Sequence, residues 1–289
     1  MKKIAVFATL CVIVLAAVAA YRYKTHIYPE LSLMKNISGT GSFASTIVRE
    51  ISTGGALRAM FDAPNSHLTG EGVLNWTNSH REELGLSPLV LNDKLSLAAQ
   101  NKVEDMFKNG YFEHISPSGK GPDYLAQAVG YEYAIIGENL ALGNYKDDQA
   151  LVKAWMDSPG HRANILNARY SEIGIWVGEG MFENKKVWLA VQEFGKPASK
   201  CPAIDENKKS QIESYKSEAV GLEFQIQQAK LELDSFSEPQ SQAELDAYNE
   251  KVRAYNSLVK FYNNKLDIIK QLTESYNLEV RAFNECVKK

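Results

Sequence analysis

Apolar residues recur at helical spacing through the first half of the chain. They lie three or four positions apart between Thr69 and Gly85, and again between Asn92 and Gly110. Each run follows a capping residue and ends at a glycine, which predicts two amphipathic helices. The stripe of the second helix is the more regular, and it consists of Leu95, Ala98, Ala99, Val103 and Met106.

Shorter segments of two kinds follow. Residues 123–128 and 147–157 keep the helical spacing. Residues 173–178 and 186–194 are β-branched and aromatic runs joined by a short connection, which predicts a β-hairpin. Residues 68–197 therefore predict an α+β domain with a small antiparallel sheet.

The spacing changes after residue 201, where apolar positions begin to alternate by four and three. This seven-residue pattern is typical of a coiled-coil seam. It is interrupted once, around Pro239, so residues 201–289 predict an antiparallel α-helical coiled-coil hairpin. The seam positions before the break are Ile212, Tyr215, Ala219, Leu222, Ile226, Ala229, Leu233 and Phe236. Those after it are Val252, Tyr255, Val259, Tyr262, Leu266, Ile269, Thr273, Tyr276, Val280, Phe283 and Val287.

The N-terminal residues 1–24 have the plan of an export signal. Lys2 and Lys3 precede an apolar run that is long for a signal peptide and at the lower limit of a membrane-spanning helix. We expect a single-pass anchor that contacts the membrane; the alternative is a signal cleaved near Ala19, which gives a secreted protein. In both cases the remaining residues lie outside the cytoplasm. Residues 25–67 contain several glycines and are interpreted as a linker.

Charge and cysteine content limit the function classes. The chain has 32 Lys and Arg against 35 Asp and Glu, so no basic field indicates nucleic-acid binding. Outside the cytoplasm, Cys201 and Cys286 are expected to form a disulfide bond. A turn centred on Pro239 leaves about 14 Å of helix between them, and the extended residues after Cys201 can span that distance.

Three short motifs carry the candidate chemistry. They are YFEH, which ends at His114, GEN, which contains Glu138, and SPGH, which ends at His161. Imidazole and carboxylate groups bind divalent cations or transfer protons near neutral pH. Each residue also has a structural interpretation, such as Glu138 capping the next helix, and periodicity alone does not bring the three together.

These motifs, together with NSHREELGLSPL at residues 78–89, resemble the CAP superfamily of cysteine-rich secretory, antigen 5 and pathogenesis-related 1 proteins, also called SCP domains. The resemblance is to the bacterial secreted branch and covers residues 68–197. It implies a three-layer α-β-α sandwich whose cavity is lined by two histidines and two glutamates. His114, Glu138 and His161 match three of these positions, and Ser158 stands where the second glutamate is expected.

The resemblance also implies that zinc or another divalent cation can bind at His114 and His161. Glu193 is a weaker candidate for a second acid, because strand alternation lets only Glu193 or Gln192 face the cavity. We assign no catalytic residue, and whether the protein is an enzyme stays open at this point.

Three functions are compatible with the sequence. The leading hypothesis is an envelope binding module that holds a metal or small ligand in the His/Glu cavity. The second is a zinc-dependent hydrolase of peptides or envelope polymers. The third is an interaction protein that recognises a partner through its hairpin.

Overall fold

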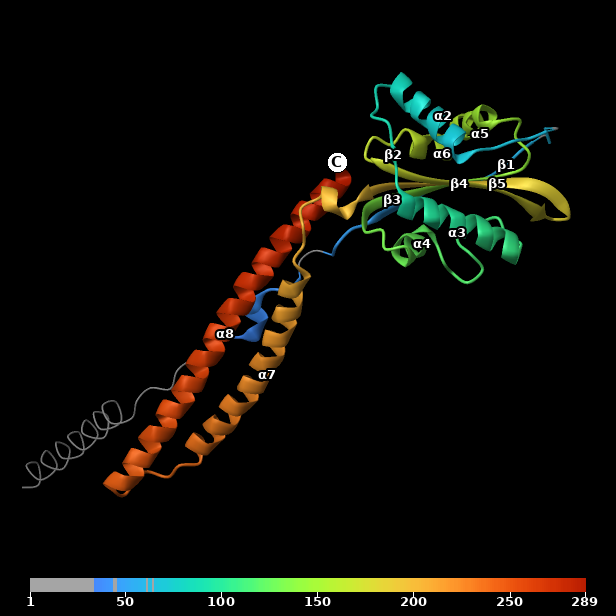
Figure 1. Cartoon of the computed structure of the whole chain (residues 1–289). Coiled ribbons are helices and arrows are strands. Elements are labelled where there is room, and N and C mark those ends of the chain that lie inside the picture. The colour runs from blue at the N-terminus through green and yellow to red at the C-terminus, as the bar shows by residue number, and fades with distance from the viewer. Residues whose placement is uncertain (1–33, 44–45, 61, 64) are drawn as a thin grey trace, which may run out of the picture. The chain divides into compact units, whose positions relative to one another are not determined.

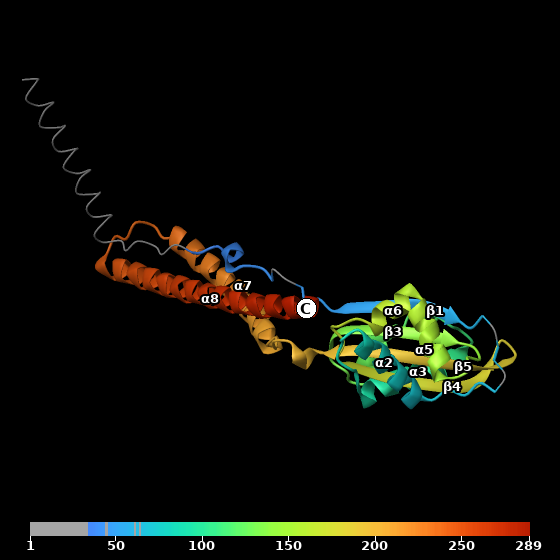
Figure 2. The ribbon, with the colours of Figure 1, turned by 90° about the horizontal axis from the view of Figure 1, so that it is seen from above.

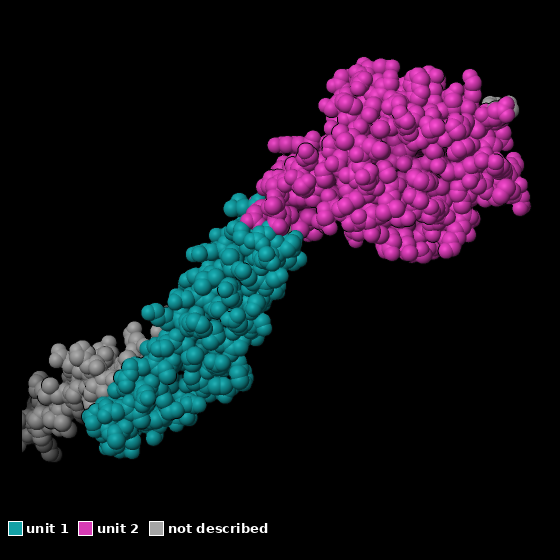
Figure 3. Space-filling view, in the orientation of Figure 1, with its two compact units in different colours: residues 1–44, 205–278 teal, residues 45–204, 279–289 magenta. Residues whose placement is uncertain are grey.

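The computed structural model describes residues 34–43, 46–60, 62–63 and 65–289 (Figure 1). The chain divides into two compact units, which Figure 3 shows in different colours. One unit contains residues 45–204 with 279–289, and the other contains residues 205–278 with the described residues before 44. The α+β architecture belongs to the first unit and the paired helices to the second.

A five-stranded sheet forms the centre of the first unit. Its order is β1-β3-β5-β4-β2. The strands are β1 (Glu50–Arg58), β2 (Val90–Leu91), β3 (Tyr133–Leu142), β4 (Glu172–Phe182) and β5 (Lys185–Pro197). The β4–β5 and β3–β5 pairs are antiparallel, but β1 and β2 join the two edges in parallel. The sheet is therefore mixed, where the sequence predicted an antiparallel one.

Strand β3 corrects the structural interpretation that Glu138 caps the next helix, because Glu138 lies within this strand. All ten residues of this strand are buried, so they show no alternation of polar and apolar positions. A strand covered on both faces lacks the period-two signal that reveals a half-exposed strand. Glu138 is thus fixed by a backbone ladder on both sides.

Helices cover both faces of the sheet, as Figures 1 and 2 show. On one face lie α3 (Asp93–Asn109) and α4 (Pro122–Ala128), and on the other lie α2 (Gly70–Glu83), α5 (Asp148–Asp157) and α6 (Pro159–Ile165). The side chains of Thr69, Asn92 and Asp147 cap helices α2, α3 and α5 by accepting backbone N–H bonds. The predicted three-layer sandwich is confirmed.

Strand β1 and the last residues of the chain extend this unit beyond the boundaries expected at residues 68 and 197. Strand β1 lies inside the range 25–67, which the sequence indicated as a linker, and it pairs with β3 along seven residues. Phe283 and Val287 belong to the same hydrophobic core as Trp155 and Ile165.

The predicted disulfide between Cys201 and Cys286 is present, with the two Cα atoms 5.6 Å apart. It joins residues 198–204, which begin with the short helix η2 (Ala198–Lys200), to the end of α8. Both cysteines lie in the same unit, so the bond fixes the C-terminal segment to the sandwich.

The second unit consists of α7 (Glu206–Asp234), most of α8 (Gln242–Lys288) and the short helix η1 (Ile37–Thr40). The buried residues of α7 recur every seven positions, at Ile212, Ala219, Ile226 and Leu233. Ion pairs Lys265–Glu218 and Lys251–Glu232 join the helices, so pairing positions rise in α7 as they fall in α8. The helices are therefore antiparallel, as predicted.

No helix in the described ranges is long and apolar enough to cross a membrane. The predicted anchor, residues 1–24, lies outside those ranges.

Candidate functional site

The middle of the sheet carries two carboxyl groups that face helix α3. Glu138 on β3 and Glu193 on β5 are direct cross-strand partners, so their side chains point to the same face of the sheet. Neither side chain is exposed to solvent. The next cross-strand position, Gly174 on β4, meets the backbone of α3, which identifies that face as the α3 side.

His114 approaches Glu138 from the loop after α3. That helix ends at Gly110, whose left-handed conformation (φ 64°) turns the chain back toward the sheet. His114 Nδ1 lies 2.5 Å from Glu138 Oε1. Since a carboxylate oxygen accepts, Nδ1 is the donor of this bond. The other ring nitrogen, Nε2, is buried and has no hydrogen-bond partner among the described residues.

The two carboxyl groups cannot both be charged at low cost. Burial, the negative charge of Glu138 and a hydrogen bond to Glu138 raise the pKa of Glu193 well above its ordinary value. Glu193 therefore keeps its proton to a higher pH than an ordinary glutamate, and in that protonated form it can donate to Glu138. Glu138 Oε2 and both carboxyl oxygens of Glu193 have no other protein donor in the described structure.

Lys102 supplies a positive charge to the same cluster. Its side chain is buried, and Nζ donates a 2.7 Å hydrogen bond to the main-chain oxygen of His114. Burial lowers the pKa of Lys102, while the charges of Glu138 and Glu193 oppose that shift. Lys102 therefore both positions the His114 loop and offsets the charge of the carboxyl pair.

His161 lies on the opposite face of the sheet, at the start of α6. Its backbone oxygen accepts from Asn139 Nδ2, and Asn139 neighbours Glu138 on β3, so the two side chains point to opposite faces. His161 Nε2 donates to Gly55 O at 2.8 Å, and Nδ1 accepts from Ser158 Oγ at 2.8 Å. Burial chiefly lowers the pKa of His161, the hydrogen bond to Gly55 O opposes that shift, and the charge of His114 adds a smaller lowering.

A closed amide network surrounds His161. Asn139 Nδ2 also donates to Gln192 Oε1 at 3.1 Å, and Gln192 Nε2 donates to Thr77 Oγ1 on α2 at 2.7 Å. Asn164 on α6 donates to Asn139 Oδ1 at 3.0 Å and to Glu138 O at 3.1 Å. These bonds fix α6 and α2 to the sheet.

The structure thus brings His114 and Glu138 together and places His161 across the sheet from them. Throughout the described ranges, no group of three or more His, Cys, Asp or Glu side chains has metal-binding spacing. Both nitrogens of His161 already have partners. The arrangement therefore does not fit a zinc ion held by both imidazoles, and zinc binding stays a prediction.

Sequence reasoning missed the contributions of Lys102, Asn139, Asn164 and β1. Asn139 is the third residue of the GEN motif, and Asn164 lies three residues after His161, so both were within reach of a motif-based search. Lys102 was not, because a lysine in an amphipathic helix normally indicates a solvent-exposed face.

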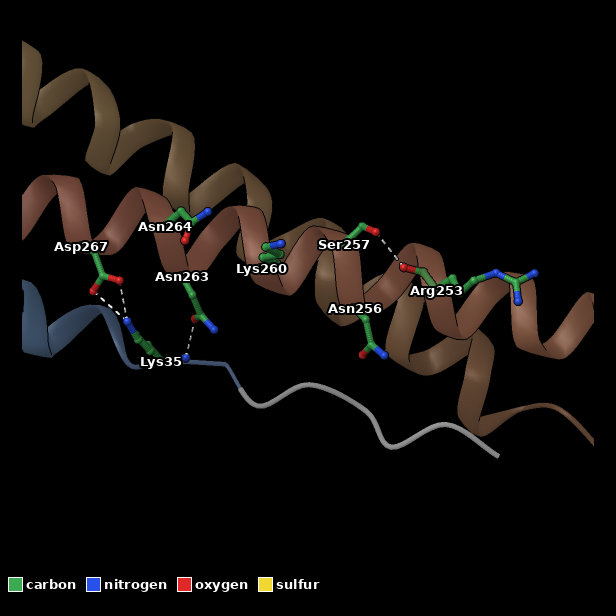
Figure 4. A pocket seen from close by; sticks show the side chains of 8 residues that line it. All are labelled: Lys35, Arg253, Asn256, Ser257, Lys260, Asn263, Asn264 and Asp267. Atoms are coloured by element: carbon green, nitrogen blue, oxygen red, sulfur yellow. Dashed lines mark hydrogen bonds and ion pairs between the residues drawn. The ribbon is translucent and has the colours of Figure 1, made fainter. Parts of the chain in front are cut away.

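Among the hollows of the described structure, one borders this site and another lies away from it. One, of about 190 Å³, lies over α3 and α4 and includes Lys102, Ser116 and Tyr111 in its wall. Figure 4 shows the other, of about 630 Å³, along α8 in the hairpin unit. There Lys35 Nζ pairs with Asp267 at 2.6 Å.

Comparisons with a family model, with curated proteins and with solved structures all find similarity to CAP or SCP domains, or to bacterial proteins. The CAP profile, described as the Cysteine-rich secretory protein family, matches residues 74–194. The uncharacterized protein YkwD of Bacillus subtilis (strain 168) is 40% identical over 122 residues, which cover 42% of this chain and 45% of that protein. The uncharacterized membrane protein YlbC of the same organism is 37% identical over 107 residues, which cover 36% and 30%. The chain thus spans less than half the length of these relatives.

Two solved structures are also similar. An extracellular protein containing a SCP domain from Bacillus anthracis str. Ames has 27% identity and a TM-score of 0.37, with 44% of this chain and 39% of that chain covered. An outer surface protein from Borrelia burgdorferi has 22% identity and a TM-score of 0.40, with 47% and 99% covered.

Proposed function

Because this chain is a bacterial member of the CAP superfamily through residues 74–194, we propose that it is an exported envelope protein whose CAP domain binds a ligand at the His114–Glu138 side of its sheet. One observation carries the proposal. Glu138 orients His114, whose Nε2 is left buried and without a partner in the described structure. A buried polar atom without a partner is costly, so its retention indicates a use other than stability.

The cell envelope is the proposed location for three reasons. Residues 1–24 have the pattern of a signal or membrane anchor, and one similar protein is named as a membrane protein. A disulfide between Cys201 and Cys286 is also stable in an oxidising compartment outside the cytoplasm.

Sedimentation with isolated bacterial envelopes tests this function. The full chain in mild detergent should co-sediment with envelopes, and the His114→Ala variant should bind at least about 10-fold less, which corresponds to a loss of ~1.4 kcal/mol. His80→Ala is the matched control, because His80 lies on α2 and pairs only with Glu83. Equal sedimentation of wild type and His114→Ala would refute the assigned site.

Zinc is the ligand that the family resemblance favours, and it is tested separately. A two-histidine site requires one nitrogen of His161 to leave its present partner, Gly55 O or Ser158 Oγ, which costs a buried hydrogen bond. Calorimetric titration of the wild type and of single His114→Ala and His161→Ala variants decides this. Loss of the zinc heat in both variants supports the metal site, whereas equal heats in all three proteins rule it out.

A hydrolase is the second candidate, and the raised pKa of Glu193 favours it. A protonated carboxyl group beside a carboxylate-oriented imidazole provides an acid and a base in one cluster. Turnover of envelope peptides that disappears in both His114→Ala and Glu193→Gln would support this function. Unchanged turnover in either variant would exclude the cluster as its source.

A further inference from the structure

Strand β1 occupies the edge of β3 directly beside the site, although it lies outside the CAP match. It runs parallel to β3 from the Glu50–Ile135 pair to the Arg58–Leu142 pair. No residue of β1 is fully buried, so the strand is held mainly by its backbone and by a few specific contacts. An extended peptide that joins a sheet edge is bound in the same manner.

The contacts in the centre of β1 admit only glycine. The register shifts between Thr53 and Ala56, so that Gly54 and Gly55 both lie opposite Asn139. A Cβ atom on Gly54 would lie 2.7 Å from His161 Cδ2 and 2.9 Å from Asn139 Oδ1. Gly55 has φ +89°, a conformation that side chains disfavour.

Helix α6 approaches the backbone of Gly54 just as closely. A Cβ atom on Gly160 of α6 would lie 2.7 Å from Gly54 O. Gly160 is the residue before His161 in the SPGH motif, so the motif provides both a slot for bare backbone and the imidazole that donates to Gly55 O. The slot and the donor act on two successive peptide units of β1.

The N-terminal half of β1 is recognised by side chains. Arg169 forms a two-point ion pair with Glu50, with Nη1 at 2.7 Å and Nη2 at 2.6 Å from the carboxylate oxygens. Ser52 Oγ donates to Asn164 Oδ1 at 2.7 Å. Together with the glycine slot, these contacts define a pattern of an acidic residue followed four and five positions later by two glycines.

From these contacts we infer that the edge of β3 and helix α6 form a groove for an extended peptide with an acidic residue and two adjacent glycines, and that β1 is the chain's own occupant of that groove. The inference goes beyond the proposed function, because it assigns a second binding site, lined by α6 and the edge of β3, and names the class of ligand for that site. The groove depends on His161 and Arg169, whereas the proposed function was carried by His114.

The connections of β1 are compatible with exchange. Among the described residues, no helix or strand lies between Thr40 and Glu50 or between Arg58 and Gly70. A segment tethered by short loops competes with a free peptide at an effective concentration on the order of mM. The intact chain should therefore bind a free peptide weakly, and weakening β1 should strengthen that binding.

Peptide binding to β1 variants tests the inference. The probe is a fluorescent peptide of residues 47–60, and fluorescence anisotropy measures its binding to full-length chains. Gly54→Val disfavours β1 in its own groove but leaves the groove walls unchanged. This variant should bind the wild-type peptide at least about 10-fold more tightly than the wild-type chain does, and it should not bind a peptide that carries Gly54→Val.

Three further measurements keep the result decisive. If Gly54→Val does not fold, Glu50→Ala removes only a partly exposed ion pair, and it should give an increase of roughly 3-fold over the wild type, or ~0.65 kcal/mol. Glu179→Ala, which removes the exposed pair with Lys186, is the control and should give no increase. His114→Ala combined with Gly54→Val should bind the peptide as Gly54→Val does, which separates this inference from the proposed function.

Two outcomes would overturn the groove. One is a folded Gly54→Val chain that binds no wild-type peptide. The other is a chain that binds the wild-type and Gly54→Val peptides equally, because such binding would not depend on a residue without a side chain at position 54.

Discussion

The two faces of the CAP sheet bury polar groups in opposite ways. On the α6 face, Asn139, Asn164, Gln192 and His161 have their hydrogen bonds satisfied by one another and by nearby backbone. On the α3 face, one imidazole nitrogen of His114 and three carboxyl oxygens of Glu138 and Glu193 have no hydrogen-bond partner outside the carboxyl pair in the described structure. Burial does not explain the difference, because Glu138 and Glu193 are as fully buried as Asn139 and Gln192. A satisfied network specifies a fold, whereas an unsatisfied one keeps atoms available for a ligand.

The comparison predicts that the α6 face is the more sensitive to losing one side chain. Asn139→Ala should lower the free energy of unfolding of the CAP unit by about 3 kcal/mol, because acceptors on His161 and Gln192 and a donor on Asn164 lose a partner. We expect a melting temperature lower by roughly 10 °C. All four tryptophans lie between residues 76 and 188, so tryptophan fluorescence reports this unit alone.

Asn109→Ala is the control for that measurement, since Asn109 is exposed and its side chain donates to Asp105 on its own helix. Its effect should stay within about 0.5 kcal/mol. If Asn139→Ala lowered the free energy of unfolding no more than the control does, the hydrogen bonds on the α6 face would not stabilise the fold as proposed.

Glu193→Gln tests the α3 face. There the substitution should change how the free energy of unfolding depends on pH, more than it changes the stability at any one pH. The pKa of Glu193 is raised in the folded state, so the folded protein holds this proton more tightly than the unfolded chain does. The stabilisation from Glu193 is complete below the ordinary pKa of 4.5 and is lost as pH rises through the raised value. Relative to the variant, the wild type should lose up to about 1.4 kcal/mol per pH unit in that window.

Urea unfolding between pH 5 and pH 9, followed by tryptophan fluorescence, measures this difference. Glu179→Gln, an exposed glutamate on the neighbouring strand β4, should keep the wild-type pH profile. Parallel profiles for wild type and Glu193→Gln would show that the carboxyl pair does not share a proton.

The smallest expected effect concerns His161 and has the opposite sign. Its pKa is lowered chiefly by burial, so the unfolded chain binds this proton more tightly than the folded protein does. The stabilisation is present above the ordinary pKa of 6.5 and is lost as pH falls toward the lowered value. NMR titration of the imidazole signals should show His161 titrating below pH 6.5. A midpoint at or above 6.5 would mean that the ring is not held as a neutral donor to Gly55 O.

Much of the fold could be predicted from the sequence because local patterns carry it. The stripe from Leu95 to Met106 predicted α3, the seven-residue spacing predicted the antiparallel helices α7 and α8, and the predicted pairing of Cys201 with Cys286 is confirmed. The elements that escaped were β1 and β3. Strand β3 is buried on both faces and so shows no alternation, and β1 contains two glycines that resemble a break in structure.

The sequence by itself determined which residues could do chemistry: it singled out His114, Glu138 and His161 through their motifs and named Glu193 as a candidate. Only the tertiary structure decided how they combine. Strand pairing set Glu138 against Glu193, the pleat sent Asn139 and Glu138 to opposite faces, and β1 gave His161 a backbone partner. Motifs record the identity of side chains, but the face to which each points follows from register and from strands that pair across long distances in sequence.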